Sequence, residues 1–401
     1  MIKVMVNEIK SLNANWNYPT DIRFGIGRIN ELTEVCKSLG ISHPMLVTDA
    51  GLAKLDMVKK IISDCNSKGI ELELFSEVKP NPTGENINKG VKKFKKMACD
   101  GVVAFGGGSG LDAGKAIALM VGQKEHIWEY EDIGDNWEKI NVDGIVPCIA
   151  IPTTAGTGSE VGRASVITDE SNQQKKIIFH PEMLPRVVIA DASLTESLPS
   201  MLTAATGLDA FVHSLEAYCA PGYHPMADGI AIESMRLIKN WLYEAVENGD
   251  NLIARSHMLV ASTMGATAFQ KGLGGVHALA HPLGAIYDKH HGLLNAILLP
   301  YVLLKNKFYI ENKIKNIAFC IGVSESHNID NSYDDFMRWV IELRKKLNIP
   351  DKLLDIGIDD KRSQQVAEMA VKDPAASTNP VLLNVEQYKE IFENAVHGKL
   401  I

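Results

Sequence analysis

The segment GVVAFGGGSGLDAGK, residues 101–115, decides the fold class. Its first five residues, from Gly101 to Phe105, form a continuous apolar run, which is typical of a strand buried on both faces. Glycines follow at once, and the residues after them are compatible with a helix. A buried strand, a tight turn and a helix in this order form the repeating unit of α/β proteins.

The rest of the first half repeats this pattern. Further apolar runs occupy residues 44–48, 70–75, 146–151 and 187–190, and helix-compatible stretches occupy residues 52–68 and 86–97. Apolar strands separated by helices indicate a mostly parallel sheet that is covered on both faces. We therefore predict an α/β domain over residues 1–196.

The second half differs, because strand signals fade after Leu198-Pro199. Long helix-compatible segments occupy residues 204–218, 226–247, 252–269 and 386–397. We expect an all-helical domain over residues 197–401. A chain of 401 residues has enough apolar material for two cores.

Composition narrows the class of partner. The formal net charge is −8, which disfavours nucleic acid and anionic membranes because both select basic faces. The six cysteines form no CxxC pair, as expected of reduced thiols in the cytoplasm. The opening segment MIKVMVNEIK lacks the apolar core of a signal peptide, and no apolar run is long enough to span a bilayer.

The turn after Phe105 is a candidate phosphate-binding site. Gly106, Gly107 and Gly108 let the backbone approach a ligand, and free N–H groups around Ser109 at the start of the next helix favour a pyrophosphate. The GxGxxG spacing of common dinucleotide-binding turns is absent. The alternative is a tight strand-to-helix turn that binds nothing.

Two more segments follow predicted strands. Asp49 stands where a carboxylate can bind the ribose hydroxyls of NAD and repel the 2′-phosphate of NADP, but it can equally cap the next helix. Residues 151–160, IPTTAGTGSE, contain Thr153 and Thr154 and stand where ligands of α/β proteins gather. An ordinary hydroxyl-rich loop would have the same composition.

A group of histidines suggests a metal site. His277 and His281 share one helical face, and His290 and His291 follow soon after. Asp209 and His213 form a second pair with the same spacing. Two such pairs can converge on an ion, and these ligands suit iron, zinc, nickel or copper better than magnesium or calcium. Spacing alone does not choose among the four histidines, although it points first to His277 with His281.

At this point the residues resemble a known family, the iron-containing (group III) alcohol dehydrogenases. The matching motifs are the glycine turn with Asp112 and Lys115, IPTTAGTGSEV from Ile151, LTESLPSMLTAATGLDAFVHSLEAY from Leu194, GLGGVHALAHPLGA from Gly272, and STNP at 377–380. The resemblance covers nearly the whole chain. It implies an N-terminal dinucleotide-binding α/β domain and a C-terminal helical domain, as in dehydroquinate synthase, with the active site between them.

The resemblance also assigns site residues. It implies that the metal ligands are Asp209, His213, His277 and His291. It places His281 at the substrate and the nicotinamide as a proton relay, not as a ligand. It further implies that NAD is contacted by Asp49, Asn81, Gly108, Ser109, Thr153, Thr154, Lys175 and Leu194.

The implied activity is hydride transfer between NAD(H) and a small alcohol or aldehyde, through an alkoxide bound to the metal. Iron is the expected metal, and zinc would suit the same ligands. Three neutral imidazoles and one carboxylate leave a dipositive ion with a net positive charge, which favours an alkoxide. A homodimer is also expected of this family.

Three positions depart from the family pattern, and one of them is Gly162, which stands where a threonine is common and could loosen one cofactor contact. His290 precedes His291 where the family usually has proline, so His290 competes as a ligand, although the ten-residue step from His281 favours His291. Lys271 stands where a small apolar residue is common. It could recognise an anionic aldehyde that bears a carboxylate or phosphonate, or it could extend to solvent.

Three other function classes are alternatives. A dehydroquinate-synthase-like lyase has the same architecture but recycles its NAD within one turnover. A metal hydrolase would need no nucleotide. The glycine turn and Asp49 disfavour this class, because both are expected to bind a nucleotide. A non-catalytic binding module is hard to reconcile with a full ligand set.

Overall fold

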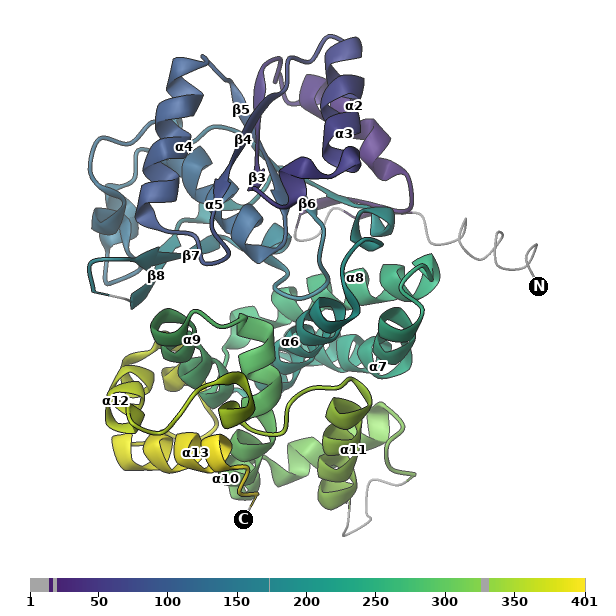
Figure 1. Ribbon diagram of the computed structural model, residues 1–401, viewed down its shortest axis with the longest axis vertical. Coiled ribbons are helices and arrows are strands. Elements are labelled where there is room, and N and C mark those ends of the chain that lie inside the picture. Colours follow the sequence, from purple (N-terminus) through teal and green to yellow (C-terminus); the bar gives the residue numbers. More distant parts are fainter. Residues whose placement is uncertain (1–13, 17–19, 173, 326–331, 401) are drawn as a thin grey trace, which may run out of the picture. The chain divides into compact units, whose positions relative to one another are not determined.

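The computed structural model describes residues 14–16, 20–172, 174–325 and 332–400, so the opening segment MIKVMVNEIK lies outside the described residues. Two compact units make up the chain (Figure 1). The first runs to Ser197 but lacks Ala155–Thr157, and the second consists of that tripeptide and Leu198–Ile401.

The first unit is built on a sheet with the strand order β1-β2-β9-β6-β5-β3-β4. All neighbours in it are parallel except β1 and β2. A separate antiparallel hairpin consists of β7 and β8. The bounds are β1 Ala14–Trp16, β2 Asp21–Phe24, β3 Pro44–Asp49, β4 Glu73–Val78, β5 Gly101–Gly106, β6 Cys148–Pro152, β7 Ala164–Asp169, β8 Gln174–Phe179 and β9 Val187–Ala190.

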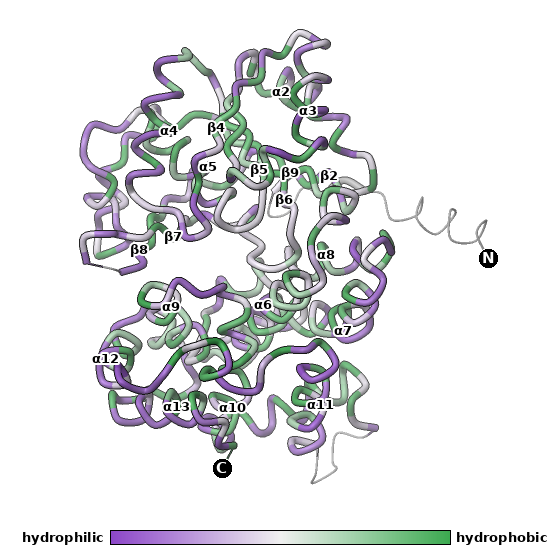
Figure 2. The backbone as a smooth tube through the Cα atoms, in the orientation of Figure 1, coloured by the Kyte–Doolittle hydropathy of each residue, from purple (hydrophilic) through white to green (hydrophobic). Residues whose placement is uncertain are grey.

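The parallel sheet and its apolar central strands are as predicted. Every residue of β5, β6 and β9 is buried, and Figure 2 colours β5 and β9 mostly as hydrophobic. The prediction for residues 70–75 was wrong at its start, because β4 begins at Glu73. The amides of Ile70 and Leu72 instead donate to Cys65 and Asn66 at the end of the preceding helix. The β7–β8 hairpin was not predicted.

Among the described residues of this unit, four α-helices accompany the sheet, and their bounds are α2 Leu32–Ser38, α3 Asp56–Ser67, α4 Gly84–Lys96 and α5 Gly108–Met120. α5 is almost wholly buried, because it packs directly on β5. A Cβ at Gly110 would lie 2.8 Å from the carbonyl oxygen of Phe105, and one at Gly114 would collide with Ala104. These glycines let the helix approach its own strand.

Helices are the regular secondary structure of the second unit over its described residues, as predicted. Its α-helices are α6 Ser200–Cys219, α7 Pro225–Glu247, α8 Leu252–Ala268, α9 Gly275–Tyr287, α10 His291–Cys320, α11 Ser332–Lys346, α12 Ser363–Lys372 and α13 Val385–His397. Outer helices such as α13 carry both polar and apolar stretches (Figure 2), whereas α6 is buried over most of its length.

α10 alone among the described helices is long and apolar enough to cross a membrane. However, 67% of its most apolar window is buried inside the unit. Its residues Leu294, Ile297 and Leu298 belong to the hydrophobic core shared with α6 and α9. Core packing therefore accounts for its composition.

Candidate functional site

The predicted cofactor residues gather at the carboxyl edge of the parallel sheet. β3 ends at Asp49, β5 at Gly106 and β6 at Pro152, and carboxyl ends of parallel strands lie along one edge. The N–H of Thr153 donates to the carbonyl of Gly106 over 2.9 Å, so the turn after β5 and the loop after β6 lie against each other.

The glycine turn has the backbone geometry of an anion site. Gly106 has a φ of +144°, which disfavours any residue with a side chain. A Cβ at Gly107 would lie 3.1 Å from Thr154, so this turn tolerates no larger residue without a shift. No side chain caps the amino end of α5, which begins at Gly108. The first N–H groups of α5 are thus not capped by a side chain, as at helix ends that bind a phosphate.

Ser109 and Asn81 are linked through the loop that follows β4. The Ser109 hydroxyl donates to the carbonyl of Pro80, next to Asn81. One residue later, the carbonyl of Pro82 accepts from the N–H of Thr168 over 2.7 Å, and Thr168 pairs with Lys175 across the β7–β8 hairpin. The hairpin therefore brings Lys175 close to this loop in the fold, although it is 94 positions away from Asn81.

Leu194 differs from the other predicted cofactor residues, because its side chain is buried in the core of the α/β unit. It also lines a cavity of about 190 Å³, together with residues of α3 that include Met57 and Ile61.

Asp49 closes the turn after β3 and is not the N-cap of α3, which is Leu55. Its Oδ1 accepts from the N–H groups of Gly51 at 2.7 Å and Leu52 at 3.0 Å. Its Oδ2 receives no hydrogen bond from the described residues. One carboxylate oxygen thus fixes the side chain, and the other is available to a ribose hydroxyl.

The motif residues Asp112 and Lys115 are structural. Asp112 accepts from the Ser159 hydroxyl at 2.5 Å and from the N–H of Val166 at 3.0 Å. The Lys115 ammonium is buried and donates to the carbonyls of Gly162 and Ala164. Both side chains tie the loop after β6 and strand β7 to α5.

The four predicted metal ligands converge in the helical unit. Asp209 and His213 lie on α6, His277 on α9, and His291 at the first position of α10. One donor atom from each lies within 4.8 Å of the others. The Nε2 atoms of His213, His277 and His291 lie 3.8, 3.9 and 3.7 Å from Oδ1 of Asp209. Their assignment as ligands stays a prediction, and this geometry supports it.

The backbone between α9 and α10 brings His291, and not the neighbouring His290, to the other three predicted ligands. α9 ends at Tyr287, and Asp288 adopts a left-handed conformation with a φ of +49°. The exposed His290 precedes α10 and is not among the four converging residues, whereas His291 is. A Cβ at the next residue, Gly292, would collide with the carbonyl of Ala205 on α6. This close contact holds the start of α10 against the helix that carries Asp209.

Glu216 is a site residue that the sequence reasoning missed. Its Oε2 lies 2.6 Å from Nδ1 of His277, and it also accepts from the N–H groups of Gly274 and Val276. Burial raises the pKa of Glu216 to about 7, against these backbone donors, which lower it. Burial also holds the pKa of His277 well below its usual range. An ionised Glu216 would cancel the net positive charge that the four ligands alone leave on a dipositive ion.

His281 points to a different partner. Its Nδ1 lies 2.8 Å from Oδ2 of Asp373, which follows α12. Its ring stacks on that of His291, with centroids 5.3 Å apart. His281 is not among the four converging residues. Of the pair to which spacing points first, His277 is therefore among the converging residues and His281 is not.

The STNP motif holds the turn that begins α9. The Thr378 hydroxyl binds the N–H and the carbonyl of Leu273, and Oδ1 of Asn379 accepts from the N–H of Gly275 at 2.9 Å. A Cβ at Gly274 would lie 2.8 Å from Glu216. The motif thus positions His277 through the backbone just before it.

Lys271 fits neither of its two expected roles. Its side chain is only 3% exposed, and its ammonium lies 2.5 Å from Asp228 and donates to the carbonyl of Tyr218. Lys313 donates to three carbonyls at the same end of α6, those of Tyr218, Cys219 and Ala220. Lys271 therefore neither reaches solvent nor offers a charge to a substrate. With Lys313 it caps the carboxyl end of the ligand-bearing helix.

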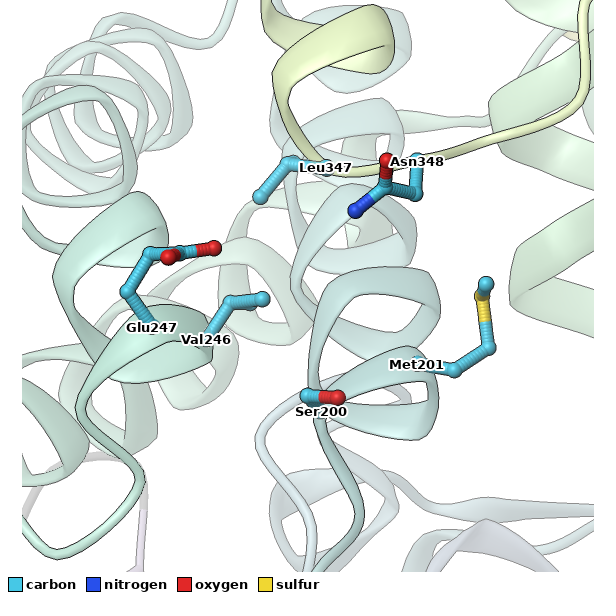
Figure 3. Close-up of a pocket in the computed structure, with 6 residues that line it drawn as sticks. All are labelled: Ser200, Met201, Val246, Glu247, Leu347 and Asn348. Carbon is cyan, nitrogen blue, oxygen red and sulfur yellow. The ribbon is translucent and has the colours of Figure 1, made fainter.

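A cavity of about 300 Å³ lies elsewhere in the helical unit, between the start of α6, the end of α7 and the turn after α11 (Figure 3). It includes no predicted site residue. Its lining residues are Ser200, Met201, Val246, Glu247, Leu347 and Asn348.

Comparisons with known proteins cover both units. A family model described as iron-containing alcohol dehydrogenase matches residues 19–192, and one for the C-terminal part of the Fe-containing alcohol dehydrogenase family matches residues 203–396. The 1,3-propanediol dehydrogenase of Citrobacter freundii is 37% identical over 376 residues, which are 93% of this chain and 96% of that protein. The NAD-dependent methanol dehydrogenase of Bacillus methanolicus is 32% identical, over 96% of this chain and all of that protein.

Solved structures agree. A crystal structure of 1,3-propanediol oxidoreductase has a TM-score of 0.89 and 35% identity, and the match covers 96% of this chain and 99% of that one. Sulfoacetaldehyde reductase from Bifidobacterium kashiwanohense, solved with NAD+, has a TM-score of 0.84 and 27% identity, with 96% and 99% covered.

Proposed function

Since the chain belongs to the iron-containing alcohol dehydrogenase family, we propose that it interconverts small uncharged primary alcohols or diols and their aldehydes with NAD(H) and iron. The observation that carries this proposal is the convergence of four side chains, three of them buried and that of His291 partly exposed: Asp209, His213, His277 and His291. Three imidazoles and one carboxylate suit ferrous iron, and they suit zinc as well.

The α/β unit would bind the dinucleotide. The amino end of α5 with Gly108 and Ser109 would hold the pyrophosphate, and Oδ2 of Asp49 would accept from a ribose hydroxyl. A 2′-phosphate would face the Asp49 carboxylate, so we favour NAD over NADP.

The helical unit would hold the metal. When bound, the ion supplies a Lewis acid that makes the hydroxyl of the substrate more acidic. Glu216 favours the His277 tautomer with its proton on Nδ1, because a carboxylate accepts there. This tautomer leaves the Nε2 lone pair of His277 directed at the other three ligands.

His281 would move the proton of the substrate hydroxyl. Asp373 binds its Nδ1 and so orients the ring, as the carboxylate does in other Asp–His pairs. Nε2 of His281 then remains for proton exchange with the substrate or with water. Asp373 acts through His281 and is a positioning residue.

The proposed activity could act on an anionic aldehyde or on an uncharged one, and the charge of the substrate separates these two alternatives. Sulfoacetaldehyde, the substrate named for one structural neighbour, is anionic, whereas propanediol and methanol, named for two relatives, are not. Lys271 was the reason to consider an anionic aldehyde here, and its ammonium is bound to Asp228. We therefore propose an uncharged substrate.

The proposed location is the cytoplasm, supported by six cysteines that form no disulfide, of which five are buried. A homodimer is proposed on the family resemblance. Light scattering of the purified protein would test it.

The deciding experiment measures NADH formed per alcohol consumed by the full chain loaded with iron or with zinc. Propanediol, butanol and 4-hydroxybutyrate would be compared, each with NAD and with NADP. We expect stoichiometric NADH, loss of turnover and metal in His277→Ala, and retention of both in His290→Ala. A dehydroquinate-synthase-like lyase would show no net NADH. Full metal-dependent activity of His277→Ala would disprove the ligand assignment.

A further inference from the structure

Asn295 stands at the centre of the candidate metal group without being one of its predicted ligands. It follows His291 by one turn of α10 and is fully buried. Its Nδ2 lies 2.7 Å from Oδ1 of Asp209, 3.1 Å from Nε2 of His277 and 3.2 Å from Nε2 of His291. A single amide nitrogen thus contacts three of the four donor atoms.

The chemistry of an amide nitrogen fixes the direction of these bonds. An amide NH₂ donates two hydrogens and does not accept, so a hydrogen bond from it to either Nε2 atom uses the lone pair of that nitrogen. The proton of each imidazole is then on Nδ1, which agrees with the contact between Nδ1 of His277 and Glu216. The same lone pairs are those that a metal ion needs.

The amide oxygen of Asn295 indicates that the predicted ligands determine how the amide is oriented. Oδ1 of Asn295 is buried and has no hydrogen-bond partner among the described residues. A buried acceptor without a partner is costly. The opposite orientation would place the amide oxygen next to a carboxylate and two imidazole nitrogens. The lone pairs of these groups would repel an oxygen, so the nitrogen faces them and Oδ1 stays without a partner.

We propose that Asn295 is a placeholder for the metal ion. Its amide shares two hydrogens among Asp209 Oδ1 and the two Nε2 lone pairs that the ion would take, so it holds Asp209, His277 and His291 together until an ion binds. An ion and the amide then compete for the two imidazole lone pairs. The inference rests on the proposed metal site, and it predicts that Asn295 stabilises the protein before metal binding more than after it.

Thermal unfolding of the full chain, with EDTA or with excess Zn²⁺, would test this role. Asn295→Leu has a similar volume but no donor. Asn316→Leu is the control, because Asn316 lies on the same helix and its amide nitrogen donates to the hydroxyl of Tyr218, outside the metal group. Asn295→Asp removes the donor and adds a negative charge beside Asp209.

We expect Asn295→Leu to lower the Tm in EDTA by roughly 5 °C or more, since buried acceptors lose their donor. Zn²⁺ should restore most of this loss, so the rise in Tm on adding Zn²⁺ becomes larger than in the unsubstituted protein. Asn295→Asp should enlarge this rise further. Asn316→Leu should lower both Tm values equally. If Asn295→Leu folds only with Zn²⁺, EDTA should unfold it, and this result would also support the proposal.

Equal losses with and without Zn²⁺ in Asn295→Leu would overturn the proposal, and so would an unchanged Tm in EDTA. Failure of the proposed function is distinguishable from this result. In that case the unsubstituted protein itself would show no rise in Tm with Zn²⁺ or no formation of NADH.

Discussion

The carboxylate of Glu216 lies 2.6 Å from Nδ1 of His277, and both side chains are buried. They lie 61 positions apart in sequence, on α6 and α9. A histidine that binds a metal through one ring nitrogen commonly donates from the other to a carboxylate, which fixes its orientation. This pair therefore joins the two helices that carry three of the four predicted ligands.

Replacing Glu216 with Gln should weaken metal binding. The amide can still fill the space, but it cannot carry the charge that favours an imidazole with its proton on Nδ1. We expect about a 10- to 100-fold loss of metal affinity, as for other partners of ligand histidines. Competition with a chelator would measure it. Glu233→Gln, at an exposed ion pair with Arg236, is the control, and equal affinities in the two variants would contradict this role.

Helical spacing contained part of this information. Asp209, His213 and Glu216 follow one another at intervals of four and three residues, so they share one face of α6. A glutamate on the helical face of two predicted ligands, in the segment from Leu208 to Cys219, was a signal that could have been used. The contacts with Asp373 and Asn295 were beyond reach, because they depend on how helices distant in sequence pack.

The Asp373–His281 pair predicts a loss of rate without a loss of metal. His281→Ala should retain the ion and lower kcat by roughly 10²- to 10⁴-fold, which is typical for removal of a general acid or base. Asp373→Asn should have a smaller effect. Its side-chain oxygen can still cap the turn at Ala375, so only the charge beside His281 is removed.

Metal content and single-turnover rates would be measured for both variants across pH. Loss of the ion from His281→Ala would make it a ligand and contradict the assignment. A wild-type pH profile of kcat in Asp373→Asn would show that Asp373 does not act through His281.

Gly292 predicts a steric effect on the metal site. A methyl group there would collide with the carbonyl of Ala205, and backbone does not yield easily. We expect Gly292→Ala to push the start of α10 away from α6, to destabilise the protein by about 1–3 kcal/mol and to weaken metal binding. Gly229→Ala on α7 is the control, because a Cβ there meets nothing within 4 Å. Unchanged metal affinity in Gly292→Ala would argue against this positioning role.

Most of the fold followed from apolar patterning, because long buried strands and helices have strong periodicity. The strand predictions at 101–105 and 187–190 agree with β5 and β9. The β7–β8 hairpin was missed, since β8 begins with Gln174, Lys175 and Lys176 and is only partly buried. The choice between His290 and His291 likewise depends on the left-handed residue Asp288, which no periodicity predicts.

Lys271 predicts a change in stability and none in substrate preference. Lys271→Met removes a buried ammonium that binds Asp228 and the end of α6. We expect a loss of about 1–3 kcal/mol, or roughly 2–10 °C in Tm, with an unchanged ratio of activities on anionic and neutral aldehydes. Lys361→Met is the control, because that side chain is 83% exposed. A selective loss of activity on anionic aldehydes would restore the role in substrate recognition.

Asp49 and Gly51 together predict the cofactor preference. Asp49→Ser should reduce the preference for NAD over NADP by roughly 10- to 100-fold, since a hydrogen bond to a charged group contributes about 1.5–3 kcal/mol. A Cβ at Gly51 would lie 2.9 Å from Oδ1 of Asp49, so Gly51→Ala should displace this carboxylate without removing it. The displacement concerns the end of a side chain, so stability should change little. We therefore expect a weaker affinity for NAD in Gly51→Ala, measured by calorimetry, at an almost unchanged Tm. If Asp49 only caps the following turn, both variants should lose stability instead, and neither should alter the ratio of NAD to NADP affinity.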